Sequence, residues 1–228
     1  MIRDNIVDLK TKIGDIAERC GRNRQDIRLV AVSKRFPVKA IIEAQNAGQV
    51  IFGENYIQEM KEKYDELGGE VQFHFIGHLQ SNKAATAAQI CSMIETVDRM
   101  KLAKILNKEL QKLNKKLDIL VQVNIAGDNS KSGISPQQAE NLLEAIQDLE
   151  MLRPLGLMTM PPFSDDPEDS RVHFRSLKKL ADILGSKKLF FDNSKIELSM
   201  GMTNDYHIAI QEGATLVRIG TAIFGHRH

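Results

Sequence analysis

Eight short apolar runs, rich in β-branched residues, alternate along this chain with stretches of helical periodicity. The runs cover residues 27–33, 49–53, 72–77, 93–97, 117–124, 153–159, 195–200 and 215–220. Stretches between them, such as 98–116 and 136–149, repeat Leu, Ile and Ala at helical spacing among charged residues. Near-continuous apolar strands separated by amphipathic helices predict a parallel sheet covered by helices. Eight such units with no segment left over favour a closed (β/α)₈ barrel, the TIM-barrel fold.

A doubly wound open sheet is the alternative with the same alternation of strands and helices. That fold is expected to carry a glycine-rich loop directly after its first strand. Here the first strand is followed by SKRFP at 33–37, which contains no glycine. The barrel is therefore the preferred prediction.

The chain begins with an expected amphipathic helix that precedes the barrel. Ile2, Ile6, Leu9, Ile13 and Ile16 recur at helical spacing between charged residues, unlike the continuous apolar core of a signal peptide. No linker rich in Pro, Gly or Ser divides the 228 residues, and no apolar run approaches the length of a membrane span. We therefore expect one domain over residues 1–228, with no membrane contact.

The charge balance and the cysteine content narrow the classes of partner. The chain has 31 basic and 30 acidic residues, a net charge of +1, whereas nucleic-acid binding through phosphate neutralisation normally needs a basic surplus. The two cysteines, Cys20 and Cys91, have no metal-ligand spacing. We interpret them as reduced thiols of a cytoplasmic protein that binds neither nucleic acid nor a metal.

Two turns near the end of the chain have the composition of a phosphate site. The sequences LSMGMT at 198–203 and VRIGTA at 217–222 each end an apolar strand in a turn rich in glycine and hydroxyl groups, before a helical stretch. Helix N-termini present unpaired N–H groups to anions, and phosphate sites of barrels recur after strands seven and eight. The sequence therefore predicts a phosphate site made by these turns.

Lys34 follows the first strand and would stand over the same end of the barrel. A lysine there is often only a surface charge, but partial burial can make the amine a nucleophile. An amine opposite a phosphate site suits a phosphorylated aldehyde, of which pyridoxal 5′-phosphate (PLP) is the commonest cofactor. Arg218, inside the eighth strand, would point inward and reach a pyridine nitrogen.

Other polar residues fall at the same end of the predicted barrel. Asn55 follows strand two and His78 follows strand three, whereas His74 lies within a strand and fits a hydrogen-bonded core residue. Residues 160–170 (MPPFSDDPEDS) are unsuited to helix or strand and form either a lid or a solvated loop. Residues 126–132 place Lys131 on this face, and 226–228 are interpreted as a polar tail.

Several motifs in order resemble the pyridoxal phosphate homeostasis protein family. They are VSK at 32–34, GENY at 53–56, FHFIGHLQSNK at 73–83, NSKSG at 129–133, GLMTM at 156–160, LSMGMT at 198–203 and VRIGTAIFG at 217–225. The match runs from before the first strand to the C-terminus. The family is similar in fold to the N-terminal barrel of alanine racemase, the fold-type III group of PLP proteins.

The resemblance implies a role for each candidate residue. The implied cofactor-binding residues are Lys34, Asn55, His78, Ser199, Gly201, Thr203, Arg218, Gly220 and Thr221. Lys34 would form a Schiff base with PLP, and Arg218 would face the pyridine nitrogen. Ser199, Gly201 and Thr203, with the backbone amides of Gly220 and Thr221, would hold the phosphate.

The remaining implied roles are less direct. Asn55 and His78 would line the pocket, and Lys131 would be a secondary PLP-reactive lysine. Thr203 stands where the family more often has serine, which keeps a hydroxyl and a helix-capping role.

The resemblance implies a PLP-binding protein of vitamin B6 homeostasis, with regulatory roles in amino-acid and keto-acid balance and no established reaction. An arginine at the pyridine nitrogen is a poor proton donor, and no second domain is left to supply a tyrosine base. We expect a monomeric carrier that exchanges PLP with apo-enzymes. The alternatives are a PLP-dependent amino-acid racemase or lyase with Tyr56 as base, and a barrel that binds a sugar phosphate or nucleotide with Lys34 as a charge clamp.

Overall fold

The computed structural model describes residues 1–128 and 131–225, and within them the strands close into a barrel. The strands follow one another around the barrel in chain order, every neighbouring pair is parallel, and β8 pairs with β1. They are β1 (Arg28–Val32), β2 (Ile51–Glu54), β3 (Gln72–Phe75), β4 (Met93–Val97), β5 (Leu117–Gln122), β6 (Leu152–Met158), β7 (Glu197–Ser199) and β8 (Leu216–Ile219). The predicted (β/α)₈ barrel is confirmed, and the open sheet is excluded.

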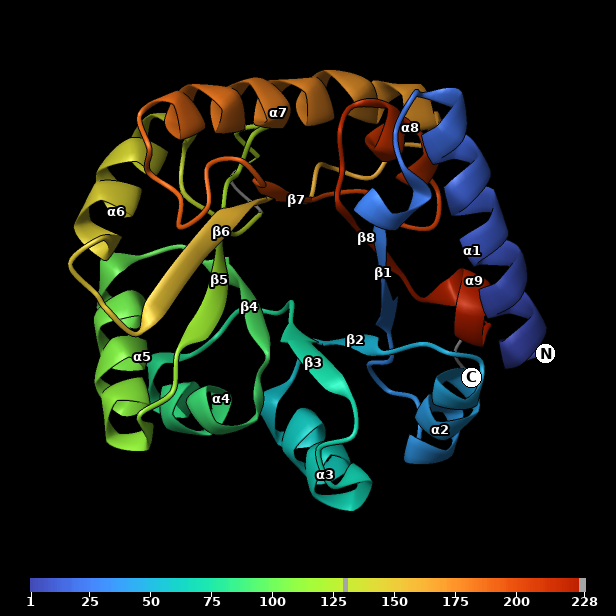
Figure 1. Ribbon diagram of the computed structural model, residues 1–228, viewed down its shortest axis with the longest axis horizontal. Coiled ribbons are helices and arrows are strands. Elements are labelled where there is room, and N and C mark those ends of the chain that lie inside the picture. Colours follow the sequence, from blue (N-terminus) through green and yellow to red (C-terminus); the bar gives the residue numbers. More distant parts are fainter. Residues whose placement is uncertain (129–130, 226–228) are drawn as a thin grey trace.

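A ring of helices surrounds the barrel (Figure 1). The α-helices are α1 (Ile2–Arg19), α2 (Val38–Asn46), α3 (Ile57–Leu67), α4 (Ala84–Ile90), α5 (Met100–Leu113), α6 (Ala139–Ile146), α7 (Arg171–Ser186), α8 (Tyr206–Gln211) and α9 (Thr221–Phe224). Short 3₁₀ turns are η1 (Arg24–Asp26), η2 (Ser81–Lys83), η3 (Pro136–Gln138) and η4 (Pro167–Ser170). The two strand ends that carry the predicted phosphate turns, β7 and β8, are neighbours in the sheet.

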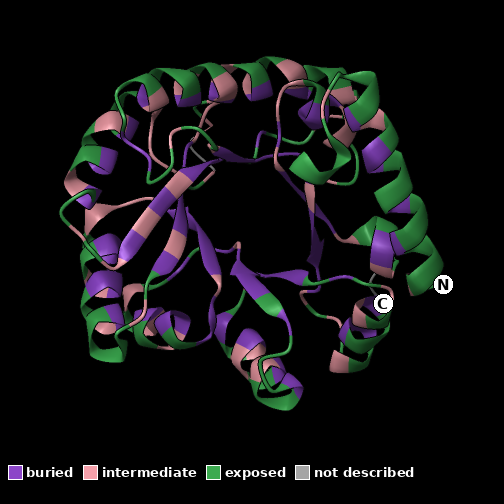
Figure 2. Ribbon diagram, viewed as in Figure 1, coloured by how far each residue is buried: buried purple, intermediate pink, exposed green. Residues whose placement is uncertain are grey.

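The core has two layers, one inside the barrel and one between the sheet and the helices. The inner layer is a small cluster of apolar side chains, one from each of six strands. They are Val30, Ile51, Met93, Leu120, Met158 and Leu216. The outer layer is the larger cluster, in which the inward faces of the helices pack on the sheet. Figure 2 shows the same pattern, with buried strands and helices that are exposed only on their outer side. The inner layer of the barrel is therefore apolar. A polar side chain that points into it needs a hydrogen-bond partner there.

The helix α1 is the predicted amphipathic helix, and it packs on the outside of the barrel against α2, α8 and α9. Its buried residues include Ile6, Leu9 and Ile13, whereas Ile2 and Ile16 are only partly buried. Fully burying one such side chain stabilises the fold by about 1.5–3 kcal/mol. Helix α1 therefore closes the ring beside the last helix, α9.

Two local predictions need correction. The turn after strand seven does not open a helix directly, because β7 ends at Ser199 and α8 begins only at Tyr206. Asp205 occupies the N-cap position of α8, so Thr203 does not cap that helix. The 160–170 loop, expected to hold neither helix nor strand, ends in the 3₁₀ turn η4, where the Asp166 side chain accepts a hydrogen bond from the Glu168 N–H.

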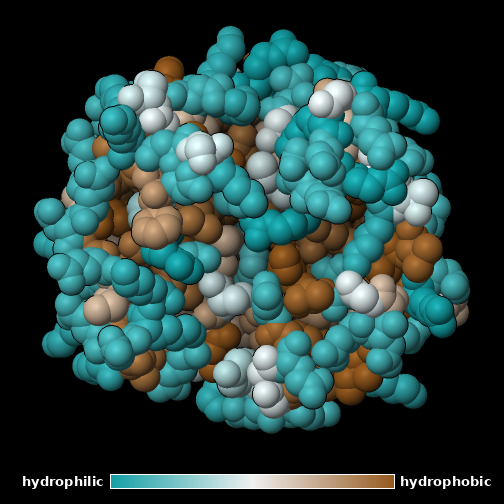
Figure 3. All heavy atoms as spheres, in the orientation of Figure 1, coloured by the Kyte–Doolittle hydropathy of each residue, from teal (hydrophilic) through white to brown (hydrophobic). Residues whose placement is uncertain are grey.

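The surface is mostly hydrophilic around the helix ring. Figure 3 shows hydrophilic residues over the circumference and hydrophobic residues gathered toward the middle of the viewed face. Among the helices of the described residues, none has the length and hydrophobicity that crossing a membrane requires.

Candidate functional site

A cavity of about 230 Å³ lies at the carboxyl ends of the barrel strands. Its lining comes from the ends of β1, β2, β3, β6, β7 and β8 and comprises Val32, Lys34, Asn55, Ile76, Met158, Met160, Met202, Thr203, Arg218, Gly220 and Thr221. Pockets for drug-sized ligands measure about 300–1,000 Å³, so this cavity suits one compact ligand. It brings together six residues that the sequence picked out: Lys34, Asn55, Thr203, Arg218, Gly220 and Thr221.

The other predicted residues lie outside the cavity lining. Ser199 is fully buried, and its hydroxyl contacts Glu95 and Arg218. Gly201 lies within the turn that follows β7 and has a φ of +92°. Its carbonyl accepts a hydrogen bond from the Arg218 N–H at 3.0 Å. The His78 side chain is 55% exposed and faces Asp98 at 3.8 Å. The structure therefore separates His78 from the cavity and places Ser199 behind Arg218.

A second depression adjoins the cavity and shares Asn55 with it. This groove of about 420 Å³ is lined by Tyr56, His78 and Lys83, among others. Tyr56 is half exposed there and is not part of the cavity lining. The phenol that the racemase alternative needs as a base thus belongs to the groove.

Arg218 is the buried cation of the cavity, and a chain of polar contacts inside the barrel holds it. It is 4% exposed. Its Nη1 donates to Ser199 Oγ at 2.5 Å, and its Nη2 donates to the Thr159 carbonyl at 2.8 Å. Burial lowers the pKa of Arg218, while the negative charges of Glu95 and Asp205 oppose that change. Because the guanidinium has no acceptor, it can only donate to a ligand.

Glu95 anchors the far end of this chain of contacts. It is fully buried on β4, accepts a hydrogen bond from Ser199 Oγ at 2.5 Å, and lies 2.7 Å from His74 Nδ1. Burial raises the pKa of Glu95, but the hydrogen bonds and charges of His74, Arg218 and Ser199 outweigh burial and leave the pKa below its usual range. Glu95 is therefore the counter-ion beneath Arg218.

Sequence reasoning missed Glu95, although a signal was present. The run 93–97 is otherwise suited to a buried strand, and a carboxylate in its middle must find a partner or remain neutral. His74 was expected to be a hydrogen-bonded core residue. Its 2% exposure and its contact with Glu95 confirm that prediction.

The turns after β7 and β8 both line the cavity, the first through Thr203 and the second through Gly220 and Thr221. Thr221 is the first residue of α9, and Gly220 before it is the N-cap. Within residues 1–128 and 131–225, the backbone N–H groups of Thr203 and Thr221 donate to no backbone carbonyl. A Cβ on Gly220 would lie 3.2 Å from the Val32 carbonyl oxygen, so a larger residue would crowd the turn. These donors suit an anion.

Asn55 supplies a further sign that the cavity is built for a ligand. Its Oδ1 is buried and has no hydrogen-bond partner among the described residues. A buried acceptor without a partner costs about 1–3 kcal/mol, so a ligand that donates to it gains affinity. Lys34, Arg218, Asn55 and the two threonine-bearing turns therefore line one cavity.

Two other sequence candidates lie apart from this cavity. Lys131 is half-buried, its N–H donates to the Asp128 carbonyl at 2.9 Å, and it is not among the lining residues. The tail 226–228, expected to be polar, lies outside the described residues.

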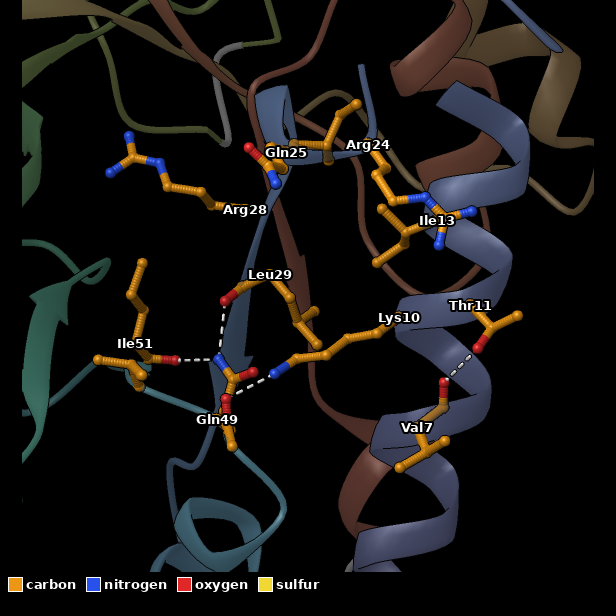
Figure 4. A pocket seen from close by; sticks show the side chains of 13 residues that line it. Val7, Lys10, Thr11, Ile13, Arg24, Gln25, Arg28, Leu29, Gln49 and Ile51 are labelled. Atoms are coloured by element: carbon orange, nitrogen blue, oxygen red, sulfur yellow. Dashed lines mark hydrogen bonds between the residues drawn. The ribbon is translucent and has the colours of Figure 1, made fainter. Parts of the chain in front are cut away.

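A larger cavity of about 520 Å³ lies at the opposite, amino ends of β1 and β2, under α1 (Figure 4). Lys10 and Gln49 are bound to the backbone there, and Arg24 and Arg28 are paired with carboxylates. Lys10 Nζ donates to the Gly48 carbonyl at 2.6 Å, and Gln49 Nε2 donates to the carbonyls of Leu29 and Ile51, each at 2.7 Å. Since conserved chemistry of barrels sits at the carboxyl ends of strands, we assign this cavity to packing.

Comparison with known proteins identifies the family of this chain. Residues 7–228 match the family model described as alanine racemase, N-terminal domain. The chain is 41% identical over 231 residues to the pyridoxal phosphate homeostasis protein of Escherichia coli K12, covering 99% of this chain and 97% of that protein. It is 39% identical over 217 residues to the protein of the same name from Aquifex aeolicus, covering 95% and 94%.

Solved structures give the same result. PipY of Synechococcus elongatus PCC7942, solved with PLP bound, superposes with a TM-score of 0.87 at 31% identity, covering 99% of this chain and 100% of that one. Alanine racemase from Corynebacterium glutamicum superposes with a TM-score of 0.71 at 14% identity, covering 99% of this chain and 61% of that one, a likeness of fold alone. The chain therefore belongs to the alanine racemase N-terminal domain family and, within it, to the pyridoxal phosphate homeostasis proteins.

Proposed function

We propose that this protein binds PLP in the 230 Å³ cavity, holds it as a Schiff base on Lys34, and serves as a PLP carrier in vitamin B6 homeostasis. The observation that carries the proposal is the meeting of Lys34, Arg218 and the two threonine-bearing turns around one cavity, which Asn55 also lines. The relatives named as homeostasis proteins and the PLP-bound PipY structure support the same ligand.

Each lining group has a task that suits its chemistry. The amine of Lys34 would hold the aldehyde of PLP as a Schiff base, a linkage that needs no oxidant or reductant. The hydroxyls and N–H groups of Thr203 and Thr221 bind the phosphate oxygens, and Asn55 Oδ1 accepts a hydrogen bond from the ligand. When bound, PLP supplies a reactive carbonyl and a pyridine ring.

Arg218 and the lining favour storage over catalysis. Facing the pyridine nitrogen, a permanent cation donates a hydrogen bond but does not give up its proton, which keeps the ring a weak electron sink. Within the described residues, the lining holds no carboxylate, imidazole, thiol or phenol that could act as a general base beside Lys34. We therefore infer a non-enzymatic role, in which a cytoplasmic monomer exchanges PLP with apo-enzymes and so regulates amino-acid and keto-acid metabolism.

The proposal is tested by visible absorbance and borohydride trapping on the purified protein with added PLP. Wild type should show the yellow band of the lysine adduct, and borohydride should fix the label on Lys34. Lys34→Ala should lose both, whereas Lys131→Ala, outside the lining, should keep both. A colourless wild-type protein, or an unchanged adduct in Lys34→Ala, would refute the assignment.

A racemase or lyase activity is tested separately by exchange of the Cα hydrogen of free amino acids in deuterium oxide. We expect no exchange above that of PLP in buffer. Exchange that disappears in Tyr56→Phe would instead establish the groove phenol as a base.

A further inference from the structure

Lys63 is a buried lysine that lies outside the cavity. It is 5% exposed on α3, while Lys61, two residues earlier on the same helix, is exposed and paired with Asp65. Lysine is almost never this buried unless its charge is paired. The partners of Lys63 therefore indicate what it does.

The three donors of the Lys63 ammonium group are all used. Nζ donates to the Ser33 carbonyl at 2.8 Å, to Glu54 Oε1 at 2.6 Å and to Glu59 Oε1 at 2.7 Å. Ser33 Oγ donates to the same Glu54 oxygen at 2.6 Å. The cluster thus ties α3 to the ends of β1 and β2.

The same cluster also binds the chain on the other side of Lys34. The backbone N–H of Arg35 donates to Glu59 Oε1. Lys34 stands between Ser33 and Arg35, so the peptide groups before and after it are bound to one set of buried charges. Arg35 has a φ of +65°, a left-handed conformation that is uncommon for a residue with a side chain. One hydrogen bond lies within this turn, from the Phe36 N–H to the Ser33 carbonyl at 3.0 Å, and the contacts from Lys63 and Glu59 hold it from outside.

Lys63 supplies the positive charge that balances the buried carboxylate of Glu54. Glu54 is fully buried, and its second oxygen, Oε2, has no hydrogen-bond partner among the described residues. Burial raises the pKa of Glu54, and the charge of Lys63 and its hydrogen bond oppose that rise. Without Lys63, Glu54 would have no cation beside it, and the Ser33 carbonyl would keep only the Phe36 N–H as a donor.

We propose that Lys63 is a positioning residue for Lys34, which it aims at the aldehyde of PLP by fixing the Ser33–Arg35 turn. This rests on the proposed function, in which Lys34 binds PLP covalently. Lys63 does not line the cavity, so it does not contribute to binding of the phosphate or the ring. Its loss should impair the capture of an aldehyde without weakening the other contacts of the ligand.

The test compares two ligands in matched variants. PLP requires Lys34 for full affinity, whereas pyridoxine 5′-phosphate, which lacks the aldehyde, measures the remaining contacts. The variants are Lys63→Met, which keeps the chain length without the charge, and the exposed-lysine control Lys61→Met. Glu59→Ala, whose parent side chain is 23% exposed, is a milder second variant that frees the Arg35 amide if Lys63→Met folds poorly.

Lys63→Met should weaken PLP binding about tenfold or more, because small displacements of a reacting group are costly. Pyridoxine 5′-phosphate should bind with an unchanged constant. Borohydride should spread the label from Lys34 to other lysines, Glu59→Ala should shift both readouts in the same direction, and Lys61→Met should match wild type.

Equal weakening of both ligands in the folded variants would show that Lys63 is merely structural and would overturn the inference. So would unchanged PLP binding and labelling in both Lys63→Met and Glu59→Ala. Failure of the proposed function itself is recognised separately, since Lys34→Ala would then keep the PLP adduct.

Discussion

Replacing Glu95 with alanine tests the buried charge chain beneath the cavity. Glu95 is fully buried between His74 Nδ1, at 2.7 Å, and Ser199 Oγ, at 2.5 Å, and Ser199 in turn accepts a hydrogen bond from Arg218. Its removal leaves a 4%-exposed guanidinium without the carboxylate that balances it. Leaving a buried charge without its compensating partner costs about 3–5 kcal/mol.

Urea unfolding measures this loss. With a slope of about 3 kcal/mol per molar urea, a loss of 3–5 kcal/mol moves the midpoint down by roughly 1–1.7 M at pH 7. Glu140→Ala is the control, since Glu140 forms an exposed pair with Lys187 of the kind that contributes about 0–1 kcal/mol. A midpoint for Glu95→Ala equal to that of the control would refute the inference that Glu95 stabilises the interior.

The pH dependence gives the same prediction a second, independent measurement. The pKa of Glu95 is lowered on folding from its ordinary value of 4.5, so its contribution to stability is complete above that pH. The contribution is lost as the pH falls through the lower pKa of the folded state. The difference in the free energy of unfolding between wild type and Glu95→Ala should therefore shrink below about pH 4.5. A difference that grows on acidification would contradict the sign of the shift.

Three further outcomes are expected. Gly201→Ala should destabilise the fold by about 1–3 kcal/mol in urea unfolding, because Gly201 has a φ of +92° and a Cβ there would lie 2.5 Å from the Ala209 Cβ. An unchanged unfolding midpoint would contradict this strain. Ile6→Ala should lower the free energy of unfolding by about 2–5 kcal/mol in the same measurement, because this fully buried side chain packs α1 on the barrel. A loss below about 1 kcal/mol would show that α1 is dispensable for packing. Thr221→Val should weaken PLP binding several-fold at constant thermal stability, because it removes the hydroxyl of a lining residue and keeps the side-chain volume. Equal affinity would remove Thr221 from the phosphate site.

The barrel was predictable because its signal is repeated. Each strand run is nearly continuous in apolar residues and each helix has a single apolar face, so eight weak local signals support one another. The gathering of Lys34 and Arg218 followed from topology alone, since the carboxyl ends of parallel strands share one end of the barrel. Strand boundaries were less certain: β7 spans only Glu197–Ser199 within the predicted 195–200.

The direction and partners of the polar side chains were not predictable from local pattern. The family resemblance implies that Ser199 holds the phosphate, but its hydroxyl donates to Glu95, 104 residues away in the sequence. Lys63 resembles any charged residue of a solvated helix face, and only the packing of α3 on the ends of β1 and β2 reveals its burial. Contacts across the sheet are set by tertiary structure, which periodicity does not encode.

Arg218 and the backbone turn that carries Lys34 are each supported by a buried carboxylate outside the cavity lining. Glu95 reaches Arg218 through Ser199 from inside the barrel, and Glu54 reaches the Lys34 turn through Lys63 from the layer between sheet and helices. The two clusters share no residue, so their effects on stability should add when Glu95→Ala and Lys63→Met are combined. Their effects on PLP binding should differ. Glu95→Ala should weaken contacts with the pyridine ring, because Glu95 supports Arg218. Lys63→Met should weaken capture of the aldehyde, because Lys63 supports the turn that carries Lys34. Additive losses of stability in the double variant, with separate losses in ring binding and in aldehyde capture, would establish two independent supports for one site. Strongly non-additive losses of stability would instead show that the two clusters are energetically coupled.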